Sequence, residues 1–170
     1  YNFSRYKKPE HEDIEEMLIV EKEGTKLPVL EQGVYRGKVM AEATSLARDM
    51  VNEPSNTMTP TQMANVAKEI AQKNNLGFKV FNSEDMEAMG MGALLGVARG
   101  SNQAPKLITL SYKGNEHFEG SIGFIGKGVT FDSGGISIKP SEGMGEMKDD
   151  MAGGAAVMAA HGAIAQLKPK

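Results

Sequence analysis

Apolar residues recur along this chain at two spacings, one typical of helices and the other of strands. Between residues 34 and 52 they return every three to four positions, which predicts a helix. Its end is expected near residue 52, because Glu53 precedes Pro54 and a pre-proline residue disfavours the α region. Residues 1–32 show no clear periodicity and hold one short apolar run, residues 17–20. We interpret residues 1–32 as a connector.

A second helix is indicated by its N-terminal residues. Thr59 is a suitable N-cap, Pro60 fits the first helical position, and Gln62 completes a capping box. Gly77 is expected to close the helix at its other end. The apolar residues that follow the cap share one helical face: Met63, Val66, Ala67 and Ile70.

The remaining patterns alternate between short strands and helices. Two further helices are expected, at 83–89 and 151–167. Strands are expected at 78–81, 94–98, 107–112 and 122–125. The last two strands are rich in apolar and β-branched residues, as buried strands of a covered sheet are. Alternating helices and strands predict the α/β class, with a largely parallel or mixed sheet.

Composition and charge narrow the functional class. The 170 residues are 40% apolar and 24% charged with a net charge of −3, which is typical of a globular protein and favours neither nucleic acid nor an acidic membrane. The absence of cysteine excludes disulfides, thiolate nucleophiles and cysteine–zinc sites. The opening residues are polar, and no stretch approaches the roughly 20 apolar residues of a membrane span. A soluble, cytoplasmic protein is therefore expected.

Polar chemistry concentrates in one glycine-rich stretch. Ten of the twenty glycines fall between residues 120 and 154. Glycine lets the backbone approach a ligand closely or adopt positive φ. Charged groups that follow a core strand often mark a site in open α/β sheets. The charged residues of this stretch that we consider are Lys127, Asp132, Lys139, Lys148, Asp149 and Asp150.

Two nucleotide or hydrolase motifs fail on spacing. A phosphate-binding loop ending at Lys127 would need glycine at position 121, which is Ser121, and Ser or Thr at position 128, which is Gly128. A nucleophile elbow around Ser133 would need glycine at position 131, which is Phe131.

A metal site and a purely structural loop are both compatible with the residues. Asp132 and Asp150 offer hard oxygen ligands for Mg, Mn or Zn. Lys127 could ligate only as the neutral amine, which needs a lowered pKa, whereas Lys139 could stay protonated and polarise a carbonyl. In the structural alternative the aspartates cap the following helix and the lysines are solvated. Spacing alone does not decide between them.

Two long motifs resemble a known family. The runs GKGVTFDSGGISIKP (126–140) and MKDDMAGGAA (147–156) closely resemble the leucyl (cytosol) aminopeptidases, which are dinuclear metallopeptidases. Weaker similarity extends through VNEPSNTMTP, MGMGALLGVARGS and PKLITLSYKG. The resemblance implies a three-layer α/β/α fold with a mixed, largely parallel central sheet, incomplete in this chain. It also implies that residues 1–32 are an interdomain connector and residues 33–170 the N-terminal half of the catalytic domain.

The same resemblance assigns roles to five residues. Lys127 and Asp150 match ligands of the tightly held metal, and Asp132 matches the carboxylate that bridges both metals. Lys139 matches the catalytic lysine, and Met147 matches a residue of the pocket for the substrate's N-terminal side chain. Outside the family pattern, Asp149 is interpreted as a helix cap and Lys148 as an exposed cation.

The implied reaction is hydrolysis of the N-terminal peptide bond of peptides with a free N-terminus, often after leucine. It implies two divalent ions, Mn²⁺ or Zn²⁺, and a hexamer for the intact family member. The family's second metal-binding run, Asn-Thr-Asp-Ala-Glu-Gly-Arg, is absent here. We therefore expect a fragment that is inactive alone and prone to self-association through exposed apolar surface. The alternative is a noncatalytic α/β interaction module with a vestigial metal site.

Overall fold

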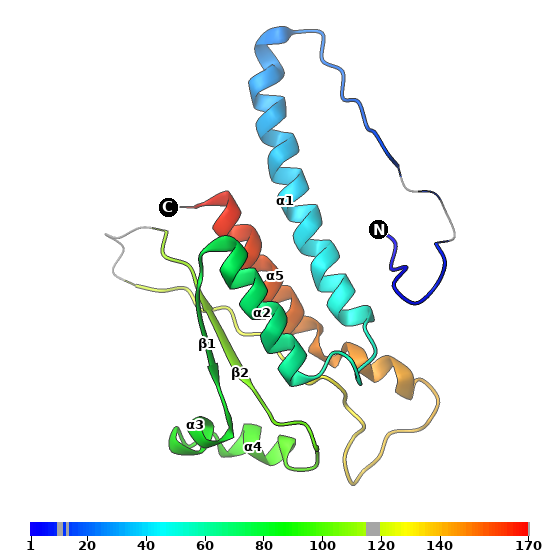
Figure 1. Ribbon diagram of the computed structural model, residues 1–170, viewed down its shortest axis with the longest axis vertical. Coiled ribbons are helices and arrows are strands. Elements are labelled where there is room, and N and C mark those ends of the chain that lie inside the picture. Colours follow the sequence, from blue (N-terminus) through cyan, green and yellow to red (C-terminus); the bar gives the residue numbers. More distant parts are fainter. Residues whose placement is uncertain (10–11, 13, 115–119, 170) are drawn as a thin grey trace.

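The computed structural model describes residues 1–9, 12, 14–114 and 120–169, and it has the α/β organisation expected from the sequence (Figure 1). The described elements, in chain order, are η1 (Gly24–Lys26), α1 (Leu27–Asn52), α2 (Pro60–Asn74), β1 (Gly77–Phe81), α3 (Ser83–Ala88), α4 (Gly92–Ala98), β2 (Leu107–Ser111), η2 (Met144–Met151) and α5 (Ala152–Leu167). The elements labelled η are 3₁₀-helices. No helix among the described residues is long and apolar enough to cross a membrane.

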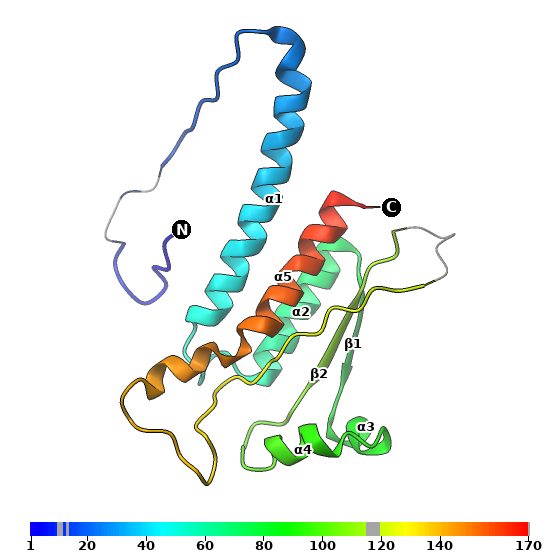
Figure 2. The same ribbon diagram turned by 180° about the vertical axis from the view of Figure 1, so that it is seen from behind.

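Three helices lie side by side and form the core layer (Figures 1 and 2). Helices α1 and α2 both pack against α5, and the Tyr35 hydroxyl of α1 donates a hydrogen bond to the Gln166 carbonyl of α5 (3.0 Å). The first turns of α1 extend beyond this layer (Figure 1). The buried cluster between the helices is mostly methionine and alanine: Met50, Met58, Met63, Ala67, Ile70, Met151, Ala155 and Met158. Small alanines let the helices approach closely, and the flexible methionines fill the gaps that remain.

The sheet has two antiparallel strands in the part of the chain that the structure describes. Phe78 pairs with Leu110 and Val80 with Ile108, and this face packs towards α2 and α5. Lys79, on the opposite face, is exposed. The α/β class is thus confirmed. The two strands that the structure describes are antiparallel, and α2 and α5 pack on the same face of the sheet.

The start of α2 agrees with the sequence and its end does not. The Thr59 side chain accepts a hydrogen bond from the Gln62 backbone N–H (3.3 Å), which is half of the expected capping box. The Gln62 side chain instead accepts from Asn65 (3.4 Å). The prediction that Gly77 closes the helix is wrong. Asn75 closes it instead, with φ of 53°, because asparagine tolerates the left-handed region.

Two of the four expected strands are wrong. Residues 92–98 form helix α4, in which Leu94, Leu95 and Ala98 share the half-buried face at helical spacing, while Val97 is 74% exposed. Residues 122–125 pair with no described segment, and Ile125 is 98% exposed. A strand exists only where a partner accepts its hydrogen bonds, and an apolar run does not supply that partner.

Helix α1 begins earlier than expected, and the chain before it folds back on its end. The helix starts at Leu27 rather than residue 34 because Pro28 suits a first turn. Residue 32 therefore lies within α1, and the division into connector and domain stays a prediction. Arg5 and the Tyr6 hydroxyl both contact the Glu53 carboxylate, which is 2% exposed. The first residues of the chain thus cover the C-terminal end of α1.

Candidate functional site

Glycines bring the segment around Lys127 into contact with the start of α5. The Gly154 N–H donates to the Lys127 carbonyl at 2.7 Å. A Cβ atom on Gly126 would lie 2.3 Å from the Gly153 carbonyl oxygen, so a side chain there is incompatible with this crossing. The two motifs that carry the family resemblance therefore cross each other directly. The crossing places Lys127 beside the residues just before α5.

The 3₁₀-helix η2 orients the second motif. A 3₁₀-helix has about three residues per turn, so residues three apart lie on the same side. Met147 and Asp150 share one side, on which both contact the candidate lysines. Lys148 and Met151 share another, where Met151 joins the core. This arrangement separates the residues that face the site from those that anchor the helix.

Lys127 and Asp150 form the first ion pair of the site. The Lys127 Nζ atom lies 2.7 Å from Asp150 Oδ1. This hydrogen bond raises the pKa of Lys127 above its ordinary value; desolvation opposes it, and the negative charges of Asp150 and Asp132 add smaller increases. Asp150 Oδ2 is buried and has no hydrogen-bond partner among the described residues. A buried carboxylate oxygen without a partner is a position where a cation fits.

Asp132 and Lys139 form the second ion pair. Lys139 Nζ lies 3.0 Å from Asp132 Oδ2, and the Gly134 N–H donates to Asp132 Oδ1 at 2.9 Å. Gly134 has φ of 88°, a conformation that side-chain-bearing residues rarely adopt. The hydrogen bond from Lys139 and then the one from Gly134 lower the pKa of Asp132, so the carboxylate stays ionised and available as a ligand.

Met147 joins the two motifs. Its Sδ atom accepts a hydrogen bond from Lys139 Nζ at 3.1 Å, and its carbonyl accepts from the Asp132 N–H at 3.2 Å. Contacts therefore run from Asp132 through Lys139 to Met147, while Lys127 and Asp150 meet beside the crossing. All five residues singled out by the resemblance thus belong to one region.

The region offers two carboxylates and one amine to a cation. Across the described residues, no group of three or more His, Cys, Asp or Glu side chains has the arrangement of a complete metal site. The donor set of Lys127, Asp132 and Asp150 suits a hard divalent ion, and the Asp150 oxygen that lacks a partner in the described part of the chain agrees with that chemistry.

The two residues outside the family pattern differ from expectation. The Asp149 side chain caps no helix; it is exposed, and its backbone carbonyl accepts from the Ala152 N–H. Lys148 is not an exposed cation, because it is partly buried and its Nζ donates to the Asn52 carbonyl at 2.5 Å.

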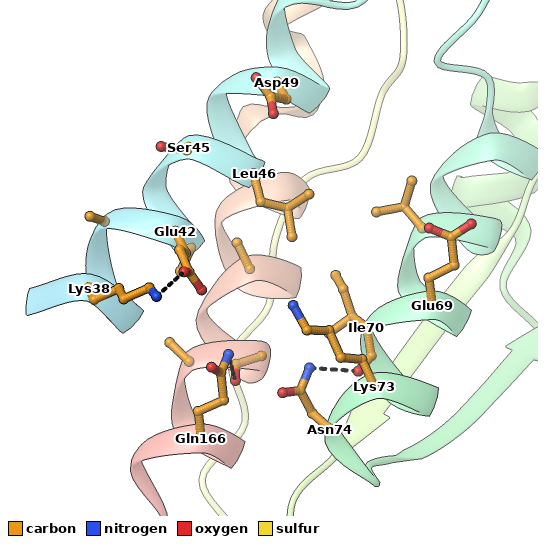
Figure 3. Close-up of a pocket in the computed structure, with 16 residues that line it drawn as sticks. Lys38, Glu42, Ser45, Leu46, Asp49, Glu69, Ile70, Lys73, Asn74 and Gln166 are labelled. Carbon is orange, nitrogen blue, oxygen red and sulfur yellow. Dashed lines mark hydrogen bonds and ion pairs between the residues drawn. The ribbon is translucent and has the colours of Figure 1, made fainter. Parts of the chain in front are cut away.

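A separate groove lies away from these residues. It has a volume of about 540 Å³ and lies between α1 and α2, over α5 (Figure 3). Leu46 and Ile70 point into it from opposite sides, and Lys38 pairs with Glu42 at its edge (3.9 Å). None of the five site residues lines this groove.

Comparison with known proteins decides the family. The model of the cytosol aminopeptidase family catalytic domain matches residues 45–170. The chain belongs to this family. The match contains both site motifs, the helices α2, η2 and α5, and the C-terminal end of α1.

Curated relatives of this chain are named cytosol aminopeptidases. The chain is 48% identical over its whole length to a probable cytosol aminopeptidase of Alkaliphilus metalliredigens (strain QYMF), of which it covers 35%. It is 53% identical over 84% of its length to one of Solibacter usitatus (strain Ellin6076), of which it covers 30%. The chain thus spans about a third of the length of these relatives.

Solved structures agree with the family. The bottromycin maturation enzyme BotP matches 98% of the chain with a TM-score of 0.81 and 36% identity, and the chain covers 33% of it. BotP in complex with Mn matches 81% with a TM-score of 0.75 and 42% identity, with 30% of that chain covered. The apo leucyl aminopeptidase of Trypanosoma cruzi matches 76% with a TM-score of 0.72 and 34% identity, with 25% covered.

Proposed function

We propose that this chain forms part of the active site of a metal-dependent aminopeptidase that removes N-terminal residues, leucine among them, from peptides. The observation that carries the proposal is the buried oxygen of Asp150 beside the Lys127 amine, which has no hydrogen-bond partner among the described residues, in a family whose relative BotP has been solved with Mn. Lys127 and Asp150 would hold one divalent ion, Mn²⁺ or Zn²⁺, and Asp132 would be shared with a second.

Lys127 and Asp132 differ in what each needs before it can bind a cation. Lys127 must give up the proton on its Nζ atom before the nitrogen lone pair can bind a cation, so its ion pair with Asp150 is a resting arrangement. Asp132, held ionised by Lys139 and Gly134, presents its charge without a change of protonation. Bound divalent ions supply the positive charge that polarises a peptide carbonyl and activates water.

Lys139 provides the donor for the substrate carbonyl. Its ammonium already lies within hydrogen-bond distance of Asp132 and Met147. From this position it would donate to the oxygen of the scissile bond as negative charge develops there, which is the kind of fixed electrostatic contact that contributes most to catalysis. Met147 would line the pocket for the N-terminal side chain.

These 170 residues alone should have little or no peptidase activity. Two carboxylates balance only two of the four positive charges of a pair of divalent ions, and the described residues hold no fuller ligand cluster. A chimera would supply the missing part of the site. In it, this chain replaces the matching stretch of the Alkaliphilus metalliredigens relative, to which it is similar over its whole length. The chimera should release leucine from a leucyl peptide.

Titration calorimetry with Mn²⁺ on the chain tests the metal assignment directly. We expect one ion to bind at about micromolar affinity or better, and binding to be lost in the Asp132→Asn/Asp150→Asn double variant. Equal binding by the double variant would show that the ion sits elsewhere. Absence of binding by the unmodified chain would show that Lys127, Asp132 and Asp150 do not form a preorganised half-site.

The family resemblance also implies a substrate class, a location and an assembly for the intact protein. We propose peptide substrates with a free N-terminus, a cytoplasmic location and a hexamer. Sedimentation of the chimera tests the assembly, because a hexamer and a monomer differ sixfold in mass.

A further inference from the structure

The helix η2 carries two site residues on an unusual scaffold. It runs for eight residues as a 3₁₀-helix, and runs longer than about four residues are uncommon because the hydrogen-bond geometry is poor. Its N-cap, Gly143, has φ of 74° and supplies no side-chain cap. A helix of this kind depends on contacts from outside for its position, and so do Met147 and Asp150.

Lys148 makes such a contact with α1. Its Nζ atom donates to the carbonyl of Asn52, the last residue of α1, at 2.5 Å in a partly buried setting. Carbonyls in the last turn of a helix lack partners within the helix, and that end carries partial negative charge. An ammonium group is therefore the kind of donor that this carbonyl favours.

The end of α1 is itself firmly held. Met50 is 2% exposed and belongs to the core cluster. Glu53, also 2% exposed, contacts both Arg5 and Tyr6. The carbonyl that receives Lys148 thus belongs to a fixed part of the molecule.

We infer that Lys148 is a positioning residue, which holds η2 on the end of α1 and thereby sets Asp150 and Met147 at their places in the site. The inference rests on the proposed function for its consequence in metal binding, and on the structure alone for the anchoring. Lys148 touches neither substrate nor metal in this scheme; it acts through the two residues on its own helix.

Mn²⁺ calorimetry on the chain tests the consequence. Lys148→Met keeps an unbranched side chain, one atom shorter, and removes the donor, so we expect the Kd for Mn²⁺ to rise about tenfold, as for other residues that orient ligands. Lys148→Arg restores a donor and should stay within about twofold of the unmodified chain. Lys68→Met, on the exposed side of α2, is the matched control and should leave the Kd unchanged. A wild-type Kd for Lys148→Met overturns the inference.

Amide hydrogen exchange tests the anchoring without metal. Three amides report on η2: those of Asp132, Glu146 and Ala152, which donate to Met147, Gly143 and Asp149. In Lys148→Met they should exchange about tenfold faster, with the Met63 amide of α2 unaffected, and Lys148→Arg should restore them. Unchanged rates at the three amides, or an acceleration throughout the chain, overturn the inference. If the unmodified chain binds no Mn²⁺, the metal half-site of the proposed function is not preorganised in this chain, and exchange still decides the role of Lys148.

Discussion

The helical layer and the glycine-rich segment 120–143 are held in opposite ways. In the layer, side chains from α1, α2, η2 and α5 bury one another in a continuous cluster. In the segment, Ile122, Ile125 and Ile136 are all exposed, and a few backbone hydrogen bonds and two ion pairs fix its course. One region thus derives its stability from apolar burial, and the other its geometry from polar contacts.

This difference implies that stability and chemistry can be altered separately. Removal of buried apolar volume costs free energy of folding wherever it occurs in the layer. Removal of a partly exposed charge in the segment costs little stability, because solvent already screens its ion pair. The predictions that follow test this separation, from the largest expected effect to the smallest.

Met50→Ala should cause the largest loss of stability. Met50 is 2% exposed in the core cluster, so its truncation leaves a cavity and should lower the free energy of unfolding by about 2–5 kcal/mol. Met40→Ala on the same helix is the control, since Met40 is 54% exposed and should change stability by no more than about 0.5 kcal/mol. Urea unfolding measures both. Equal losses would mean that the layer is not the stabilising core.

Lys139→Ala should lower activity without lowering stability. In the chimera we expect kcat to fall about 100-fold or more, roughly 2.7 kcal/mol of transition-state stabilisation, as for removal of an oxyanion donor. The melting temperature and the Mn²⁺ content should stay those of the unmodified chimera, because Lys139 is a surface-accessible partner of Asp132. Lys68→Ala serves as the control. A lowered melting temperature with unchanged kcat would reverse the assigned role.

Metal affinity should rise with pH. The pKa of Lys127 is raised by its hydrogen bond to Asp150, so the ammonium persists through neutral pH and one proton must leave when a cation binds. The pKa of Asp132 is lowered, so this carboxylate adds no proton between pH 6 and 8. The Kd for Mn²⁺ should therefore fall about tenfold per pH unit in this range. A Kd independent of pH would exclude the Lys127 amine as a ligand.

Thr59→Ala should cause the smallest change. Loss of the side-chain cap on α2 should cost about 1 kcal/mol of stability without any effect on Mn²⁺ binding, because the cap belongs to the layer. Thr57→Ala is the control, since Thr57 is exposed and contributes its backbone carbonyl to Thr59. A change in Mn²⁺ affinity would show that the two regions are coupled through α2.

Elements with their own local signals were predicted well. Thr59 and Pro60 marked the start of α2, and the strands at 77–81 and 107–111 and the helices at 83–88 and 152–167 fall within one or two residues of expectation. Caps, turns and periodicity act between residues that are close in the chain, so the sequence displays them directly.

Elements that depend on distant partners were predicted poorly. The run Leu94–Ala98 is as apolar as a strand, yet it forms a helix packed beside α3, and short apolar runs do not distinguish the two. Residues 122–125 have the composition of a strand but no described partner. The contact of Lys148, on the 3₁₀-helix η2, with Asn52 joins residues 96 positions apart, which no local pattern reveals.

The sequence by itself determined the family and several helix ends, and it singled out the residues of the candidate site, because long motifs and caps are local properties. Tertiary structure alone decided which of those residues meet. The crossing of Gly126 with Gly153 sets Lys127 on Asp150, and the fold of the loop sets Lys139 on Asp132. The physical reason is that hydrogen bonds and ion pairs act over a few ångströms, and only packing brings separate segments within that distance.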